Sequence, residues 1–370
     1  MKTDHLIFVS YNTYPSVRGG SEVFNYYLMT ELAKSYRVSC LCYENDAVAG
    51  VKSLRLIKLK PKKFFAPLQT ILALIFLKFK FWTCRHKIIL TYSRSSIVHW
   101  LFYPILKYLL SIEYFIVIHD SDFSPWFPAS IFRFVFRGAT NAFGVSKLVC
   151  KEYQARTGRE ILELRPFIPF MKPNIGRAEL RDRHLLPRDA LVLLFVGSLK
   201  PLKQPLVLLD ALEGISEEAF KALKLQVLII GDGPLRKTLE QRIAQSHLRR
   251  FVRLCGQVGR EELPCYYALS DLYVIPSLRE AFPISLMEAI VHGLSIIGAD
   301  SPGINNLIKD GINGLLFEPK NTYKLRQKLL LLAHDQRFRD NLTSHRELGF
   351  EFEAGFQKMT KHLLYHLHPQ

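Results

Sequence analysis

The chain has 370 residues, of which 49% are hydrophobic and 22% are charged, and its formal net charge is +17. This composition is that of a globular protein and excludes a disordered polar chain, and the length predicts two domains. The charge is uneven, because twelve Lys and Arg side chains lie between Ala47 and Ile112 without a single Asp or Glu. A basic surface of this kind favours a polyanion or an anionic membrane as a partner.

Cysteine usage and the first residues bear on the compartment. The six cysteines form no CxxC pair and several lie in apolar, strand-like runs. This pattern favours a reduced, cytoplasmic compartment over a disulfide framework. The first apolar run, Leu6–Val9, is too short for the core of a signal peptide and predicts a first strand.

Strand-like and helix-like segments alternate along the chain, which predicts an α/β protein with mainly parallel sheets. In the first half we expect strands at 6–10, 37–43, 87–92, 114–119 and 141–146, and helices at 21–34, 96–110 and from 147. The proline-rich stretch Arg165–Pro173 breaks this pattern and predicts a linker. In the second half we expect strands at 191–196, 226–230, 251–255, 272–276, 295–298 and 314–317. Two Rossmann-like domains facing a central cleft should then bind ligands beyond the carboxyl ends of their strands.

The most informative motif runs from Ser277 to Glu288. It follows a predicted strand and contains Pro283, a residue type favoured at the start of a helix. The free N–H groups of such a first turn can hold a diphosphate. Glu280 precedes the turn and can accept hydrogen bonds from sugar hydroxyls, while Glu288 can reach ribose hydroxyls. The alternative is a pair of surface carboxylates beside an ordinary helix.

Two further turns follow strands of the second half. After the strand that ends at Gly197, Lys203 can act as a point charge for a phosphate, although a solvated lysine in a turn is the alternative. The turn Gly231–Arg236 has glycines for a tight strand-to-helix connection, and Pro234 is expected to begin the helix. Such turns are common in α/β proteins, so this second motif is weak alone.

Two motifs of the first half complete the set. Gly19 and Gly20 allow close approach of the backbone to a phosphate, and Ser21 is expected to cap the first helix. His119 follows a predicted strand and can face the cleft and hydrogen-bond a sugar. A satisfied structural histidine is the alternative for His119.

Taken together, and with the runs Asp271–Ser277 and Asp310–Pro319, these motifs resemble family 4 of the retaining GT-B glycosyltransferases. The resemblance is best over Leu191–Pro319. It implies that Glu280 binds the donor sugar, that Lys203 binds the diphosphate and that His119 lies near the reacting carbon, so that these three form the catalytic set. The residues it implies for donor binding are Gly19, Gly20, Gly197, Ser198, Lys203, Gly231, Gly233, Ala281, Phe282, Pro283, Ile284, Ser285 and Glu288.

The resemblance also implies a hexosyltransferase. In such an enzyme an oxygen of the leaving diphosphate helps to deprotonate the acceptor, which attacks the donor sugar on the same face. The protein then needs positioning and charge stabilisation more than a base. No metal and no cofactor are expected, since the nucleotide-sugar donor is a co-substrate. The expected domains are residues 1–168 for the acceptor, 175–345 for the donor, and a C-terminal helix, 346–370, packing back toward the first domain.

The sequence departs from the family pattern at four positions. Ser198 stands where the family usually has a phosphate-binding arginine, Gln204 and Ala281 replace glycines, and Asn306 replaces a common acidic residue. The first departure leaves open an inactive family member that acts as a binding partner. A nucleotide-sugar epimerase on the same fold is a further alternative, although the Glu280 and Glu288 motif with Lys203 favours transfer.

An apolar and basic region in the first half suggests a membrane partner. The uncharged run Phe64–Leu77 is 14 residues long, short of the ~20 that span a bilayer, and lysines flank it. This pattern and the stretch Ile97–Ile112 favour an interfacial helix on anionic lipid, with core helices as the alternative. We therefore expect a peripheral protein on the inner face of the membrane with a lipid-linked or glycan acceptor, in polysaccharide or lipopolysaccharide biosynthesis. No nucleic-acid-binding module is found, so no nucleic-acid partner is expected.

Overall fold

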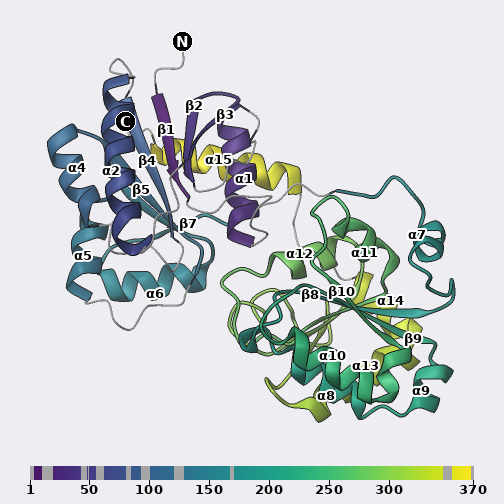
Figure 1. The fold of residues 1–370 in the computed structure, drawn as a ribbon. Coiled ribbons are helices and arrows are strands. Elements are labelled where there is room, and N and C mark those ends of the chain that lie inside the picture. The colour runs from purple at the N-terminus through teal and green to yellow at the C-terminus, as the bar shows by residue number, and fades with distance from the viewer. Residues whose placement is uncertain are drawn as a thin grey trace. The chain divides into compact units, whose positions relative to one another are not determined.

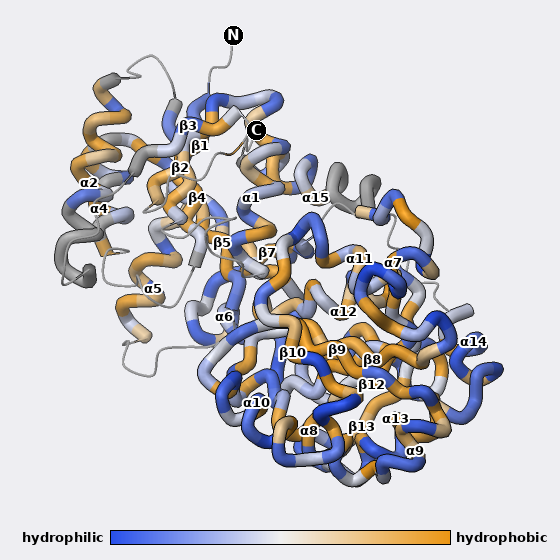
Figure 2. Tube along the Cα trace, turned by 45° about the vertical axis from the view of Figure 1, so that its right-hand side comes forward, coloured by the Kyte–Doolittle hydropathy of each residue, from blue (hydrophilic) through white to orange (hydrophobic). Residues whose placement is uncertain are grey.

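The computed structural model describes residues 4–10, 20–42, 48, 50–55, 62–80, 85–92, 101–120, 129–166, 171–344 and 352–367. The chain divides into two compact units, residues 1–169 with 350–370, and residues 170–349. Each unit is a parallel sheet with helices packed on it, as Figure 1 shows. The strands of both sheets are drawn mainly in the hydrophobic colour in Figure 2.

The first unit has a seven-stranded sheet in the order β3-β2-β1-β4-β5-β6-β7, and its neighbouring strands all pair in parallel. Its strands are β1 (Asp4–Val9), β2 (Arg37–Cys42), β3 (Val51–Arg55), β4 (Arg85–Tyr92), β5 (Glu113–Ile118), β6 (Asn141–Gly144) and β7 (Leu162–Glu163). Its helices are α1 (Gly20–Leu32), α2 (Lys62–Lys80), α4 (Phe102–Leu110), α5 (Ala129–Gly138), α6 (Lys147–Thr157) and α15 (Phe352–Leu367).

The last helix, α15, belongs to this first unit although it follows the whole second unit in the chain. Met359 and Leu363 are buried in the same core cluster as Phe24 of α1. Asn141 donates a hydrogen bond from Nδ2 to the carbonyl oxygen of His366 at 3.1 Å. The end of the chain therefore completes the core of the unit that the beginning of the chain forms.

The second unit has a six-stranded parallel sheet in the order β10-β9-β8-β11-β12-β13. Its strands are β8 (Leu191–Val196), β9 (Leu225–Ile230), β10 (Val252–Gly256), β11 (Leu272–Ile275), β12 (Ser295–Ala299) and β13 (Leu315–Phe317). Its helices are α7 (Arg177–Arg183), α8 (Pro205–Glu213), α9 (Glu217–Ala222), α10 (Arg236–Gln245), α11 (Leu263–Leu269), α12 (Ile284–Val291), α13 (Thr322–His334) and α14 (Gln336–Ser344), with short 3₁₀ helices η1 (Pro201–Lys203) and η2 (His247–Arg250).

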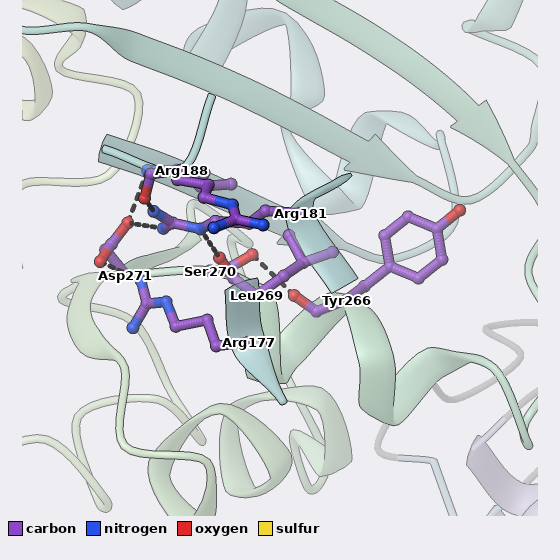
Figure 3. A network of polar contacts seen from close by, with 8 residues as sticks. Arg177, Arg181, Arg188, Tyr266, Leu269, Ser270 and Asp271 are labelled. Atoms are coloured by element: carbon purple, nitrogen blue, oxygen red, sulfur yellow. Dashed lines mark hydrogen bonds and ion pairs between the residues drawn. The ribbon is translucent and has the colours of Figure 1, made fainter. Parts of the chain in front are cut away.

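A partly buried ionic network anchors the amino-terminal end of β11 (Figure 3). Asp271 accepts hydrogen bonds from Arg177, from Arg181 at 2.8 Å and from the backbone N–H of Val192 at 2.8 Å. Arg181, whose side chain is 6% exposed, also donates to the carbonyl oxygens of Leu269 and Arg188. Because Asp271 joins β11 to α7 and β8, this network fixes the strand that leads to the motif at 277–288.

The expected α/β architecture with two Rossmann-like units is confirmed, with differences in detail. Two edge strands, β3 and β7, were not expected. Ser21 lies inside α1 and donates to Glu22 at 2.8 Å instead of capping the helix. Pro234 does not begin α10 but lies in the turn before it. A hydrogen bond from the Leu235 N–H to the Leu199 carbonyl oxygen holds this turn outside the helix. Pro283 is the N-cap of α12, one residue before the helix begins.

Helices α2 and α4 lie side by side in both views of the first unit (Figures 1 and 2). Both helices carry exposed apolar side chains. We call this set, with one residue of α5, the exposed apolar face. It comprises Leu72, Phe76 and Phe79 of α2, Ile105, Tyr108 and Leu109 of α4, and Phe134 of α5. Tyr108 is 88% exposed and Leu109 is 68% exposed. Within the described residues, no helix is both long enough and apolar enough to span a bilayer.

Candidate active site

The loops that follow β8, β9, β11 and β12 are joined to one another by backbone hydrogen bonds. The N–H of Leu199 donates to the carbonyl oxygen of Asp232 at 2.9 Å, and that of Leu278 donates to Leu202 at 3.0 Å. The N–H of Glu280 donates to Pro302 at 2.9 Å. All four loops lie at the carboxyl ends of parallel strands, where α/β sheets bind their ligands.

Two glycines allow this close approach. Gly231 has a φ of +137°, and a Cβ there would overlap the carbonyl oxygen of Gly197. Gly303 has a φ of +89°, and a Cβ there would overlap the carbonyl oxygen of Glu280. At both positions the conformation and the space require glycine, so the predicted turns at 197 and 231 are brought into backbone contact. Gly233 makes a similar approach to the backbone of Leu199.

Lys203 and Glu280, which lie 77 residues apart, form an ion pair. The Lys203 Nζ lies 2.7 Å from Oε1 and 2.6 Å from Oε2 of Glu280. Glu280 is 9% exposed, so its charge is compensated mainly by this lysine. Gln204, which follows Lys203, has a φ of +51°, and this left-handed conformation explains why a glycine suits this position.

The first turns of α12 carry Ser285 and Glu288 against buried tyrosines. The Tyr273 hydroxyl donates to Ser285 Oγ at 2.8 Å, and the Tyr267 hydroxyl donates to Glu288 Oε2 at 2.9 Å. Arg260 forms an ion pair with Oε1 of Glu288. Burial raises the pKa of Tyr267 well above its ordinary value, and the neighbouring Glu288 adds to this rise. Both tyrosines therefore remain hydrogen-bond donors, and they fix the start of the helix.

The loop Ala281–Pro283 connects Glu280 to α12. Ala281 and Phe282 are partly buried and Pro283 is buried, while Ile284 begins the helix with its N–H directed to the carbonyl of Phe282 at 3.0 Å. Gly197 and Ser198 lie partly buried in the loop after β8, which the bonds of Leu199 connect to the turn at Gly231 and Gly233. The structure thus gathers the predicted donor-binding residues of the second unit at one edge of its sheet.

The first unit holds the remaining predicted residues. His119 follows β5, and its Nε2 lies 3.1 Å from Oδ1 of Asn25 on α1. Its ring packs edge-on against Phe24. Gly20 is exposed at the start of α1, and Gly19 lies outside the described residues. Burial lowers the pKa of His119 from 6.5 to about 3, so the imidazole is neutral at physiological pH.

This pKa predicts an acid-sensitive contribution of His119 to stability. The pKa of His119 in the folded state lies below the ordinary value. The full contribution of His119 to the free energy of unfolding is therefore present above pH 6.5 and is lost as the pH falls from 6.5 toward 3. The loss is at most about 1.4 kcal/mol per pH unit. We expect His119→Gln to flatten the decline in unfolding free energy between pH 7 and 5, measured by urea denaturation. His334→Gln, at an exposed position of α13, is the control and should keep the slope of the unmodified protein.

The loop that contains Ser198 is hydrogen-bonded to the turn that precedes Arg236. Arg236 begins α10, donates from Nε to Glu240 at 2.7 Å and lies 3.5 Å from Asp232. A Cβ on Gly256 would meet its Nη1 at 3.1 Å, which places the guanidinium at the end of β10. Arg236 is thus engaged by two carboxylates at the edge that carries the site.

Sequence reasoning missed four residues of this arrangement: Asn25, Arg260, Tyr267 and Tyr273. The two tyrosines lie in apolar runs that are typical of a core. Only their hydroxyl groups, which need hydrogen-bond partners when buried, indicate a role beyond packing. No group of three or more His, Cys, Asp or Glu residues suited to a metal ion occurs in the described part of the chain.

Two parallel-sheet units with this arrangement of strands define the GT-B architecture. Solved structures agree. Anabaena Alr3699/HepE in complex with UDP and glucose superposes with a TM-score of 0.78 at 16% identity, covering 98% of this chain and 99% of that one. WaaG, a glycosyltransferase involved in lipopolysaccharide biosynthesis, superposes with a TM-score of 0.70 at 16% identity, covering 96% and 98%. At these identities the likeness establishes the fold.

The sequence of the second unit is similar to known glycosyltransferases. Residues 176–347 match the family "Glycosyl transferases group 1". Alpha-D-kanosaminyltransferase of Streptomyces kanamyceticus is 30% identical over 169 residues, which are 46% of this chain and 43% of that relative. The chain thus spans less than half the length of this curated relative.

Proposed function

We propose that the protein is a glycosyltransferase that moves a hexose from a nucleoside diphosphate sugar to an acceptor, with retention of configuration. The observation that carries this proposal is the Lys203–Glu280 ion pair beside the first turn of α12. It places a cation, a carboxylate and a helix N-terminus at one edge of the sheet. The cation and the helix N-terminus suit a diphosphate. The carboxylate suits a sugar with several hydroxyl groups.

Each part then has a separate task. Lys203 and the backbone N–H groups at the start of α12 hold the diphosphate and stabilise the charge that develops on it as the glycosidic bond breaks. Glu280 accepts hydrogen bonds from hydroxyls of the donor sugar, and Glu288 accepts those of the ribose. His119, kept neutral, hydrogen-bonds a sugar hydroxyl near the reacting carbon. The leaving diphosphate oxygen takes the acceptor proton on the same face, so neither a protein base nor a metal is required in this proposal.

A thermal-shift screen tests the donor site. UDP, GDP, ADP and their common sugar conjugates are added to the purified protein, because a ligand that binds only the folded state raises Tm. At a concentration 100 times Kd the stabilisation is about 2.7 kcal/mol. We expect one nucleotide class to raise Tm, and Glu288→Ala to reduce that rise. The absence of a shift with every nucleotide would contradict the proposed function and favour an inactive family member.

We also propose that the acceptor is lipid-linked and that the exposed apolar face rests on anionic lipid at the cytoplasmic side of a membrane. Seven large apolar side chains are exposed on this face, and two cations, Arg133 and Arg137, are exposed on α5 beside Phe134. Apolar side chains can enter the acyl boundary while neighbouring cations meet the headgroups. Such an enzyme would act in the synthesis of a surface polysaccharide or lipopolysaccharide.

Sedimentation with vesicles tests the membrane proposal. The paired substitution Leu72→Ser and Phe76→Ser is expected to weaken partition into vesicles that contain anionic lipid by about tenfold or more, because two apolar side chains lose their buried state. Leu331→Ser removes a leucine that is 45% exposed on α13 in the second unit, compared with 57% for Leu72, and should leave partition unchanged. Equal binding by all three proteins, or no binding by the unmodified one, would contradict the proposal.

A further inference from the structure

The carboxylate of Glu288 is held from two sides by residues outside the sequence motif that contains it. Arg260, in the turn after β10, forms an ion pair with Oε1. Tyr267, on α11, donates its hydroxyl to Oε2 at 2.9 Å. The side chains of Arg260 and Glu288 are only 10% and 13% exposed, so this contact is largely removed from solvent.

Tyr267 is itself fixed in place. It is 1% exposed, and the ring of His292 stacks on it at a centroid distance of 5.1 Å. Its hydroxyl also lies 3.2 Å from the carbonyl oxygen of Ser285, in the first turn of α12. The Tyr267 hydroxyl therefore fixes the position of Glu288 relative to the helix N-terminus.

The hydrogen-bonding capacity of the carboxylate decides what Glu288 can still do. An ionised carboxylate has about four lone-pair sites, two on each oxygen. Arg260 uses a site on Oε1 and Tyr267 uses a site on Oε2, so each oxygen retains a site. Two acceptor sites on one rigid carboxylate match the two adjacent hydroxyls of a ribose, which are both donors.

We infer that Arg260 and Tyr267 are positioning residues that orient Glu288 to accept both ribose hydroxyls, and that they thereby make the site selective for ribonucleotide over deoxyribonucleotide donors. This inference rests on the proposed function. Arg260 supplies the positive charge that compensates this largely buried carboxylate. Tyr267 fixes the second oxygen, so the carboxylate cannot rotate away from the diol.

Nucleotide discrimination is the readout, because general damage to the fold would weaken all ligands alike. Kd is measured by calorimetry for UDP, GDP and ADP, and then for the 2′-deoxy and 3′-deoxy forms of the one that binds best. We expect the unmodified protein to prefer the ribonucleotide by about tenfold or more, since a hydrogen bond to a charged group is lost with each hydroxyl. Arg260→Gln should reduce this preference to within about threefold, mainly by weakening the ribonucleotide.

Two further variants sharpen the test. Tyr267→Phe removes one hydroxyl and should reduce the preference by about threefold, and it carries the test if Arg260→Gln does not fold. Arg250→Gln is the matched control, because Arg250 pairs with Glu217 at an exposed position of the same unit. It should leave the preference unchanged.

The outcomes separate the inference from the proposed function. If the unmodified protein binds no nucleoside diphosphate, the proposed function fails and the inference fails with it. If it binds one but does not discriminate against the deoxy forms, only the inference is overturned. It is also overturned if Arg260→Gln and Tyr267→Phe weaken every ligand by the same factor, because that result describes a purely structural role.

Discussion

Replacing Glu280 by glutamine is expected to lower kcat/KM for sugar transfer by about 100- to 1,000-fold, and Lys203→Ala should have an effect of similar size. The two side chains form one charged unit, with the lysine Nζ at 2.6 and 2.7 Å from the carboxylate oxygens. Glutamine keeps the shape of Glu280 but removes the charge that holds Lys203. Alanine at 203 removes the cation proposed for the diphosphate. Initial rates with the nucleotide sugar that the thermal-shift screen identifies give the measurement.

The control for this experiment is a second lysine–glutamate pair in the same unit. Lys221 and Glu217 form an exposed pair on α9, and such pairs contribute little to stability. Lys221→Ala should therefore leave kcat/KM within about twofold of the unmodified protein. If Lys203→Ala also left the rate unchanged, the ion pair would have no part in transfer, and the site would need a different assignment.

Combining the two substitutions shows whether Lys203 acts only through Glu280. Residues in direct contact are not additive, so the double variant should lose less than the product of the two single losses. If Lys203 merely orients Glu280, the double variant should equal Glu280→Gln alone. We expect a further loss, because the proposed role of Lys203 includes the diphosphate.

The strands of the second unit could be predicted from the sequence to within one residue at most ends, because most of them are apolar runs with few exposed residues. β8, at Leu191–Val196, has the predicted bounds and is buried over nearly its whole length. The edge strands β3 and β7 could not be predicted in this way. β3 contains Lys52 and Ser53, and β7 is two residues long, so neither shows an apolar run. Their pairing with β2 and β6 comes from tertiary structure.

Some residues of the candidate site could likewise be predicted from the sequence, and others could not. Residues that lie in one sequence motif, such as Glu280 and Ser285, could be found from local patterns of glycine, proline and carboxylate. Residues that act through partners distant in the sequence could not. Asn25 contacts His119 across 94 positions, and Tyr267 reaches Glu288 across 21. These contacts depend on which strand neighbours which, and the sequence pattern does not specify the rotation of each side chain.

Replacing Asp271 by asparagine is expected to lower the free energy of unfolding of the second unit by about 3 kcal/mol. Asparagine fits the same space but leaves Arg181, whose side chain is 6% exposed, without its carboxylate (Figure 3). Burial already lowers the pKa of Arg181, and Asp271 opposes that shift, so the guanidinium depends on this partner. The change also weakens the bond that Asp271 accepts from the Val192 N–H, which joins β8 to β11. Urea denaturation followed by circular dichroism measures the loss.

Asp182→Asn is the control, because it breaks an exposed Arg–Asp ion pair of the same chemistry as the largely buried Arg181–Asp271 pair. Asp182 pairs with Arg188 at 2.6 Å, but the two side chains are 47% and 70% exposed, so we expect no measurable change in unfolding. Asp271 precedes β11, whereas the candidate site follows the strands. Asp271→Asn should therefore retain nucleotide binding at a temperature where it is folded. Equal destabilisation by both substitutions would contradict the role of burial, and loss of binding in folded Asp271→Asn would show that the network reaches the site through β11.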